Sequence, residues 1–192
     1  MSALDALLAQ VRACRLCEEH LPLGPRPVLR AAPTARLLIV GQAPGTKVHE
    51  TGIPWNDRSG ERLRAWMAVD PETFYDETRI AIVPMGFCYP GRDPKGGDRP
   101  PRPECAPTWH DPLLQHLPAL RLTLLIGGYA QTRYLGGRDS MTERVRAFRT
   151  HLGRGVLPLP HPSWRTTHWQ KQNPWFDAEV LPVLQARVTA LL

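Results

Sequence analysis

Four short segments of this chain are rich in apolar residues, and longer stretches of mixed character separate them. They are residues 37–40, 79–83, 122–126 and 156–159, each four or five residues long. Short apolar runs bounded by Gly, Pro and polar residues are typical of strands buried in the middle of a sheet. We therefore expect a sheet of four short strands.

Helical patterns alternate with these strands. Helices are predicted at residues 4–11, from an N-cap at Ser59 through Trp66, at 112–120, within 130–134 and 142–151, and from Asn173-Pro174 onward. The segment 46–58 is expected to be a polar connection. Strands that alternate with helices predict an α/β fold whose largely parallel sheet is covered on both faces. No repeat or linker is visible, so one domain, 1–192, is expected.

Two of the strands are followed by unusual loops. The first strand enters Gly41-Gln42-Ala43-Pro44-Gly45, where the glycines permit a tight backbone, Pro44 stiffens the turn and Ala43 leaves space above it. The last strand enters residues 161–165. Ligands of open α/β sheets bind beyond the carboxyl ends of the strands, so the two loops are expected to form two walls of one cleft.

The residues in and near these loops suit a nucleobase and its phosphates. Trp55 offers a flat apolar face with Asp57 close by, and the second loop contains His161, Ser163, Trp164 and Arg165. Aromatic faces beside cations and a hydrogen-bonding His are typical of nucleic-acid sites. Each residue alone also has an ordinary explanation: Trp55 as rim packing, Asp57 as a helix start and His161 as a strand-end residue bonded to backbone.

The charge balance of the chain also favours a nucleic-acid partner. The chain carries 24 Lys and Arg against 18 Asp and Glu, a net charge of +6, which suits a polyanionic partner. No apolar run approaches the roughly 20 residues of a membrane span, and the N-terminus has no signal-peptide pattern. A cytoplasmic protein with no membrane partner is therefore expected, and we expect a monomer.

Four cysteines are notable in such a reducing compartment. Cys14 and Cys17 enclose two residues, and Cys88 and Cys105 enclose sixteen in a long loop rich in Pro and Gly. A close CxxC pair with two distant cysteines predicts a tetrathiolate site for zinc or an iron–sulfur cluster. Four unrelated thiols are the alternative.

Taken together, the motifs resemble those of the uracil-DNA glycosylase superfamily, and in particular its iron–sulfur branch, families four and five. The resemblance rests on "GQAPG" after the first strand, "TGIPWNDRSG" at residues 51–60, "HPS" at 161–163 and the layout of the four cysteines. These motifs span most of the chain in the family's order. The resemblance implies a three-layer αβα sandwich with a central, mainly parallel four-stranded sheet.

The resemblance also implies roles for individual residues. Cys14, Cys17, Cys88 and Cys105 would hold a structural [4Fe-4S] cluster, with zinc as the alternative. Trp55 would stack on a base flipped out of DNA, and His161 would stabilise the charge that develops on the departing base. The remaining base- or DNA-binding positions implied are Gly41, Ala43, Pro44, Gly45, Ser163, Trp164 and Arg165.

This chain departs from the family pattern at the first loop. Gln42 and Ala43 stand where family four has a Glu and the classical enzymes an Asp, while Asp57 is in register with an Asp of family five. The catalytic residues expected are therefore Asp57, His161 and Gln42.

Pro84 stands where family four reads uracil with an Asn, which makes hypoxanthine and xanthine candidate substrates. Trp164 or Arg165 stands where relatives intercalate a Leu.

The function expected is that of a DNA repair glycosylase that hydrolyses the N-glycosidic bond of uracil or other deaminated bases. The missing first-loop carboxylates motivate an alternative, a protein of the same fold that binds damaged or single-stranded DNA without cutting the bond. A third interpretation makes the cysteines a zinc site beside an unrelated nucleotide-processing activity.

Overall fold

A parallel β-sheet forms the centre of the protein, whose computed structural model describes residues 2–192. Its strands are β1 (Leu37–Val40), β2 (Ile80–Ile82), β3 (Leu122–Ile126) and β4 (Val156–Leu159). They lie in the order β2-β1-β3-β4, and every neighbouring pair is parallel. The predicted four-stranded parallel sheet is therefore confirmed, with strand ends within one residue of those expected.

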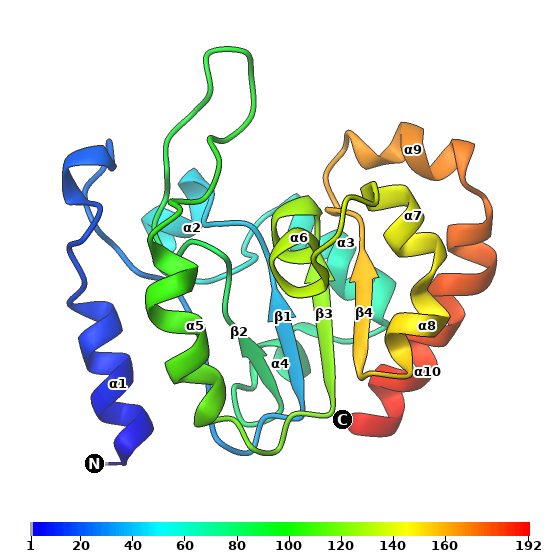
Figure 1. The fold of residues 1–192 in the computed structure, drawn as a ribbon, viewed down its shortest axis with the longest axis horizontal. Coiled ribbons are helices and arrows are strands. Elements are labelled where there is room, and N and C mark those ends of the chain that lie inside the picture. Colours follow the sequence, from blue (N-terminus) through cyan, green and yellow to red (C-terminus); the bar gives the residue numbers. More distant parts are fainter. Residues whose placement is uncertain (1) are drawn as a thin grey trace.

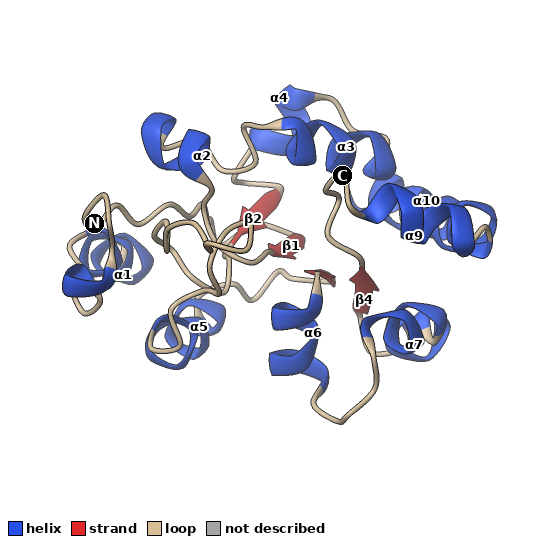
Figure 2. Cartoon of the chain, turned by 90° about the horizontal axis from the view of Figure 1, so that it is seen from above, coloured by secondary structure: helices blue, strands red, loops and turns tan. Residues whose placement is uncertain are grey.

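Helices cover the sheet on both faces, as Figures 1 and 2 show. One layer contains α1 (Ala3–Arg12), α5 (Cys105–Gln115) and α6 (Gly128–Leu135), and the other contains α3 (Arg58–Met67), α4 (Pro71–Tyr75) and α10 (Leu181–Leu191). The remaining helical elements are η1 (Glu18–His20), α2 (Thr46–Thr51), α7 (Met141–Arg146), α8 (Phe148–Leu152), α9 (Thr166–Gln172) and η2 (Phe176–Val180). The result is a three-layer αβα arrangement.

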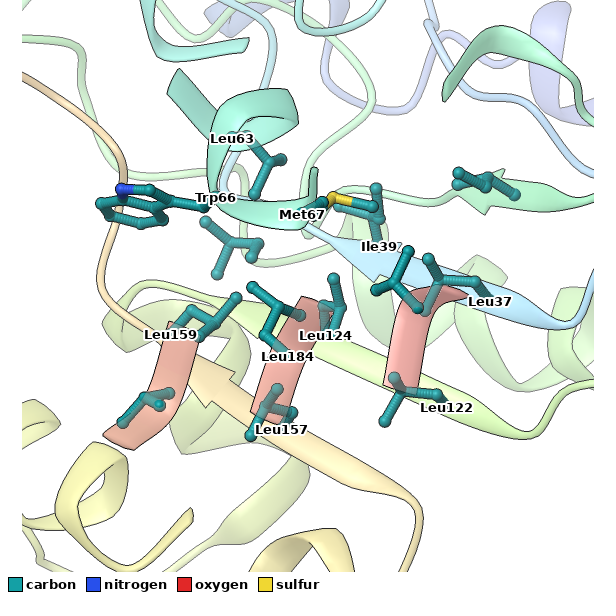
Figure 3. Packing of buried hydrophobic residues seen from close by; sticks show 14 of the residues in the cluster. Leu37, Ile39, Leu63, Trp66, Met67, Leu122, Leu124, Leu157, Leu159 and Leu184 are labelled. Carbon is teal, nitrogen blue, oxygen red and sulfur yellow. The ribbon is translucent and has the colours of Figure 1, made fainter. Parts of the chain in front are cut away.

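The period-2 alternation of side chains along each strand divides the core into two clusters. Leu37 and Ile39 point to one face, where they pack with Leu63 and Met67 of α3, Leu184 of α10 and residues of β3 and β4 (Figure 3). Leu38 and Val40 point to the other face, among residues of α1, α5 and α6. Because both faces are buried, the strands read as continuous apolar runs.

Several helix boundaries differ from those expected. Asp57, not Ser59, caps α3: its backbone is extended, and its carboxylate accepts the N–H of Gly60 at 2.8 Å. The helix expected at 112–120 instead begins at Cys105 and contains Pro112. The apolar run that predicts this helix starts only at Pro112, whereas burial of His110 and Leu113 on one face continues the helix across the proline.

Other corrections concern short elements. The helix expected within 142–151 is divided at Ala147 into α7 and α8. The polar connection 46–58 contains α2, which begins directly after the first loop. The last helical segment follows Asn173-Pro174 as expected, but it starts with the π-helical turns of η2. Within residues 2–192, no helix is both long enough and apolar enough to cross a membrane.

Strand order determines where the loops meet. After β1 the chain runs to one neighbour, β2, and then returns to the opposite neighbour, β3. The carboxyl ends of β1 and β3 therefore form a topological switch point, the usual ligand site of an open α/β sheet. In Figure 1 the long loop, residues 89–104, is drawn in green and rises above this edge of the sheet. Helix α9 lies above the same edge, at the opposite end of the sheet over β4.

Candidate active site

An open cavity of about 580 Å³ lies at the carboxyl edge of the sheet. It brings together residues from segments far apart in sequence, namely the first loop, the turn before α3, the loop after β4 and the long loop. Every residue predicted to be catalytic or to bind base or DNA lines it: Gly41, Gln42, Ala43, Pro44, Gly45, Trp55, Asp57, His161, Ser163, Trp164 and Arg165. The predicted two walls therefore enclose one space.

Trp55 is held in a strained position at the cavity wall. Its φ is 57°, in the left-handed region that residues other than Gly rarely adopt. Its carbonyl oxygen accepts hydrogen bonds from Arg64 Nη1 and the Tyr75 hydroxyl, both at 3.3 Å. The indole packs so closely over Gly41 that a Cβ there would lie 2.8 Å from Trp55 Cζ2. Gly41 is thus required by the ring that covers it.

His161 lies beside this indole. The two ring centroids are 5.6 Å apart, and the planes are inclined by 32°. Burial lowers the pKa of His161 below its usual range, although the nearby Asp57 carboxylate acts in the opposite direction. The imidazole is therefore neutral at pH 7 and offers one N–H donor and one acceptor nitrogen.

The loop after β4 is fixed to α3 and to its own turn. The carbonyl oxygen of His161 accepts the N–H of Ser163 at 2.8 Å and the hydroxyl of Thr166. Arg62 of α3 donates to the carbonyl of Ser163 at 2.9 Å and to Thr167 Oγ1 at 3.0 Å. These contacts hold His161 in a defined position relative to Trp55 and Asp57.

Gln42 joins the first loop to the long loop. The side-chain amide of Gln42 donates to the backbone carbonyl of Arg99 at 3.4 Å, and the backbone carbonyl of Gln42 accepts the N–H of Gly86 at 2.9 Å. The bond to Arg99 uses one N–H of the side-chain amide, so its second N–H can donate to, and its oxygen can accept from, a ligand or a water molecule.

Trp164 and Arg165 differ in their surroundings. Trp164 is 80% exposed, while the Arg165 guanidinium lies against Gly97, where a Cβ would be 3.1 Å from its Nη1. Arg165 therefore bridges the mouth of the cavity to the long loop, and its guanidinium carbon also lies 5.6 Å from the centroid of the exposed Trp164 ring.

Residues of the long loop were missed by the sequence analysis. Arg92, Gly96, Gly97 and Asp98 all line the cavity. Asp98 is a second carboxylate beside Asp57, and burial raises its pKa, aided by the charge of Asp57 and opposed by Arg92. The loop has no hydrophobic period, and its Pro- and Gly-rich sequence predicts only a loop.

The four cysteines lie around a second, smaller cavity, next to Leu16, Gly86 and Trp109. The backbone N–H of Phe87 donates to Cys105 Sγ at 3.4 Å. Burial raises the pKa of the Cys88 thiol to about 11 and that of Cys105 to about 12. Among the described residues, no group of three or more His, Cys, Asp or Glu has the arrangement of a single-ion site.

A parallel α/β sheet with a cavity at its carboxyl edge, lined by an aromatic face, a neutral imidazole and two carboxylates, defines the class of open α/β proteins whose ligand site lies beyond the strand ends. Residues 30–185 match the family model described as the uracil DNA glycosylase superfamily. The chain belongs to that superfamily, as its motifs predicted. The match covers all four strands and both loops of the cavity.

Proposed function

We propose that this protein is a DNA glycosylase that hydrolyses the N-glycosidic bond of uracil or another deaminated base. The observation that carries the proposal is the convergence of Trp55, Asp57 and His161 on one cavity of about 580 Å³. A base flipped out of the helix needs an aromatic face to stack on and a donor for its developing negative charge. Trp55 supplies the first, and the neutral His161 supplies the second.

The other residues fit the same reaction. As the bond breaks, the sugar acquires positive charge, which the Asp57 carboxylate stabilises from the start of α3. Gln42 lines the cavity and can hydrogen-bond a water molecule or the base through its side-chain amide. The basic surface implied by the net charge of +6 attracts the DNA backbone. The narrower assignment to the iron–sulfur branch of the superfamily forms part of this proposal.

Base release from a panel of oligonucleotides tests the function. The strands carry uracil, hypoxanthine or xanthine, single- or double-stranded, and alkali reveals the abasic sites. We expect release of at least one of these bases by the wild-type protein. Pro84 lines the cavity, so a preference broader than uracil alone is expected.

A second candidate function is binding of damaged or single-stranded DNA without base release. It is favoured by Gln42, which is an amide and cannot act as a general base in the first loop. Retained affinity for lesion-containing strands, with no abasic product from any member of the panel, would replace the glycosylase proposal with this one.

Trp164, rather than Arg165, is proposed to fill the gap left by a flipped base, since Arg165 is packed on Gly97. Trp164→Ala is expected to slow base release from duplex DNA about tenfold while affecting single strands less, because stacking contributes about 1–3 kcal/mol per base. Unfolding stability should stay within about 0.5 kcal/mol of wild type, since the side chain is 80% exposed. Rates on matched duplex and single-stranded substrates measure the difference.

The control is Tyr129→Ala, which removes another exposed aromatic side chain of a residue that does not line the cavity. Equal slowing of duplex and single-strand cleavage by Trp164→Ala would exclude the wedge role.

The cysteine cavity is proposed to hold a [4Fe-4S] cluster, with zinc as the alternative. Its donors are thiols, the ligands that iron–sulfur clusters and zinc share. The Phe87 N–H aimed at Cys105 and the buried, unpartnered indole N–H of Trp109, among the described residues, suit the sulfur atoms of a cluster. When bound, the cluster would tie the N-terminal segment to the long loop and α5.

Purified protein is expected to contain iron and to absorb in a broad band at about 400 nm, without stoichiometric zinc. Cys14→Ser and Cys105→Ser should each abolish the band, because each removes a ligand. Leu16→Ala, between the two cysteines of the CxxC pair and exposed, should keep it. Colourless wild-type protein with one zinc per chain would establish the alternative.

A further inference from the structure

The long loop contains a hairpin, residues 91–99, that carries Asp98 into the cavity. Arg92 and Asp98 pair as an antiparallel bridge, and Asp93 N–H donates to the carbonyl of Gly97 at 2.9 Å. At the base of the hairpin, the N–H of Arg99 donates to the carbonyl of Gly91 at 2.8 Å. These bonds give a Pro- and Gly-rich segment a defined shape, so Asp98 is held by backbone geometry.

Three contacts hold this hairpin against the residues of the active site. Gln42 of the first loop donates to the carbonyl of Arg99, directly after Asp98. A Cβ on Gly45 would lie 3.6 Å from Asp98 Oδ2, so the carboxylate faces the end of the first loop. Arg165 packs on Gly97, directly before Asp98. Asp98 is therefore fixed against both loops that form the cavity walls.

Asp57 and Asp98 occupy different environments in the same cavity. One oxygen of Asp57 is engaged by the N–H of Gly60 as the cap of α3. Within residues 2–192, the carboxylate of Asp98 has no hydrogen bond, and no cationic side chain lies within 4 Å of it. The more distant charges of Arg92 and Asp57 still act on its pKa, in opposite directions. Two carboxylates in unlike surroundings are suited to unlike roles.

We propose that Asp98 is the general base that takes a proton from the attacking water in the hydrolysis proposed above. The water oxygen forms a bond to the sugar carbon, and its proton moves to the Asp98 carboxylate. The electron pair of the N-glycosidic bond leaves with the base, whose negative charge is met by the N–H of His161. Asp57 stabilises the positive sugar. The products are an abasic sugar and a free base, which is protonated from Asp98 or solvent.

This assignment gives the long loop a catalytic role and places the base on a segment different from the first loop. It also accounts for the amide at Gln42, which orients the Arg99 backbone and thereby Asp98. The inference rests on the proposed glycosylase function, because it names the group that activates water in that reaction.

Asp98→Asn tests the inference under single-turnover conditions on the best substrate of the panel. We expect the rate of base release to fall about 10²-fold or more, in line with loss of a general base, while affinity for the same lesion-containing strand changes less than about threefold. Asp98→Glu should restore part of the rate. The control is Asp93→Asn in the same hairpin, whose carboxylate accepts the N–H of Lys95 at 2.8 Å and lies outside the cavity lining.

A pH–rate profile gives a second readout. The wild-type rate should fall as the pH drops through the raised pKa of Asp98, and this acid limb should be altered in Asp98→Asn. The charged groups that face or flank Asp98 are Arg92, Asp57, Arg99 and Arg165. His161 is the titratable imidazole of the same cavity, so the profile is also recorded for His161→Asn, and Asp57→Asn controls for the other carboxylate.

The outcomes separate the two proposals. Wild-type protein that releases no base from any substrate contradicts the glycosylase function itself. Wild-type protein that releases base while Asp98→Asn does so at the same rate contradicts only the role of Asp98. A loss of affinity as large as the loss of rate would make Asp98 a binding residue and overturn the general-base assignment.

Discussion

Asp57→Asn is expected to slow base release by about 10²-fold or more while leaving the free energy of unfolding within about 0.5 kcal/mol of wild type. Asn caps helices as well as Asp does, so its side-chain oxygen still accepts the N–H of Gly60. The substitution removes the negative charge that faces the developing positive charge on the sugar. Single-turnover rates and urea unfolding of the same preparation measure the two quantities.

The matched control is Asp70→Asn. Asp70 caps α4 in the same manner, by accepting the N–H of Thr73 at 2.7 Å, and it does not line the cavity. It should therefore show the same small change in stability and a wild-type rate. Asp57→Ala, in contrast, loses both functions and should also lose about 1 kcal/mol of stability. A wild-type rate for Asp57→Asn would mean that Asp57 serves only as the cap of α3.

Gly60→Ala is expected to destabilise the protein by about 3 kcal/mol or more. A Cβ at this position would lie 1.7 Å from the carbonyl oxygen of Trp55 and 2.6 Å from its carbonyl carbon. These are backbone atoms, and the same oxygen accepts bonds from Arg64 and Tyr75, so it cannot swing aside. Overpacking against fixed backbone commonly costs about 1–3 kcal/mol and occasionally more.

The damage should reach the cavity as well. Relief of the clash requires movement of Trp55. Its indole then no longer packs on Gly41 or lies beside His161. Gly128→Ala is the control, since nothing lies within 4 Å of a Cβ there and Ala favours a helix by about 1 kcal/mol over Gly. Urea unfolding distinguishes the variants. If Gly60→Ala unfolds at the wild-type midpoint, α3 does not approach Trp55 as closely as described.

The sheet could be predicted from sequence because its strands are buried on both faces. Such strands are short apolar runs, and their pattern survives whatever surrounds them. Helix boundaries were predicted less well for a local reason. Pro112 and Ser59 are common at helix starts, but burial of one face of α5 and the extended backbone at Asp57 determined where the helices begin.

The candidate site was predicted in part for a related reason. The loops after β1 and β4 stand out because they follow recognisable strands, and the parallel sheet places both at one edge. Asp98, in contrast, does not follow a strand that the sequence pattern identifies. It lies in a segment of Pro, Gly and charged residues whose local pattern predicts only a loop.

By itself, the sequence determined the four strands, their parallel arrangement, the two loops at one edge and the superfamily, because burial periodicity and short motifs are local properties of the chain. Only the tertiary structure decided that the hairpin 91–99 folds back over the first loop and that Trp55 is held at a positive φ against Gly41. It also decided that two carboxylates face one cavity. These features depend on contacts between separate segments, such as Gly41 with Trp55 and Gln42 with Arg99, and no local pattern records which segments pack together.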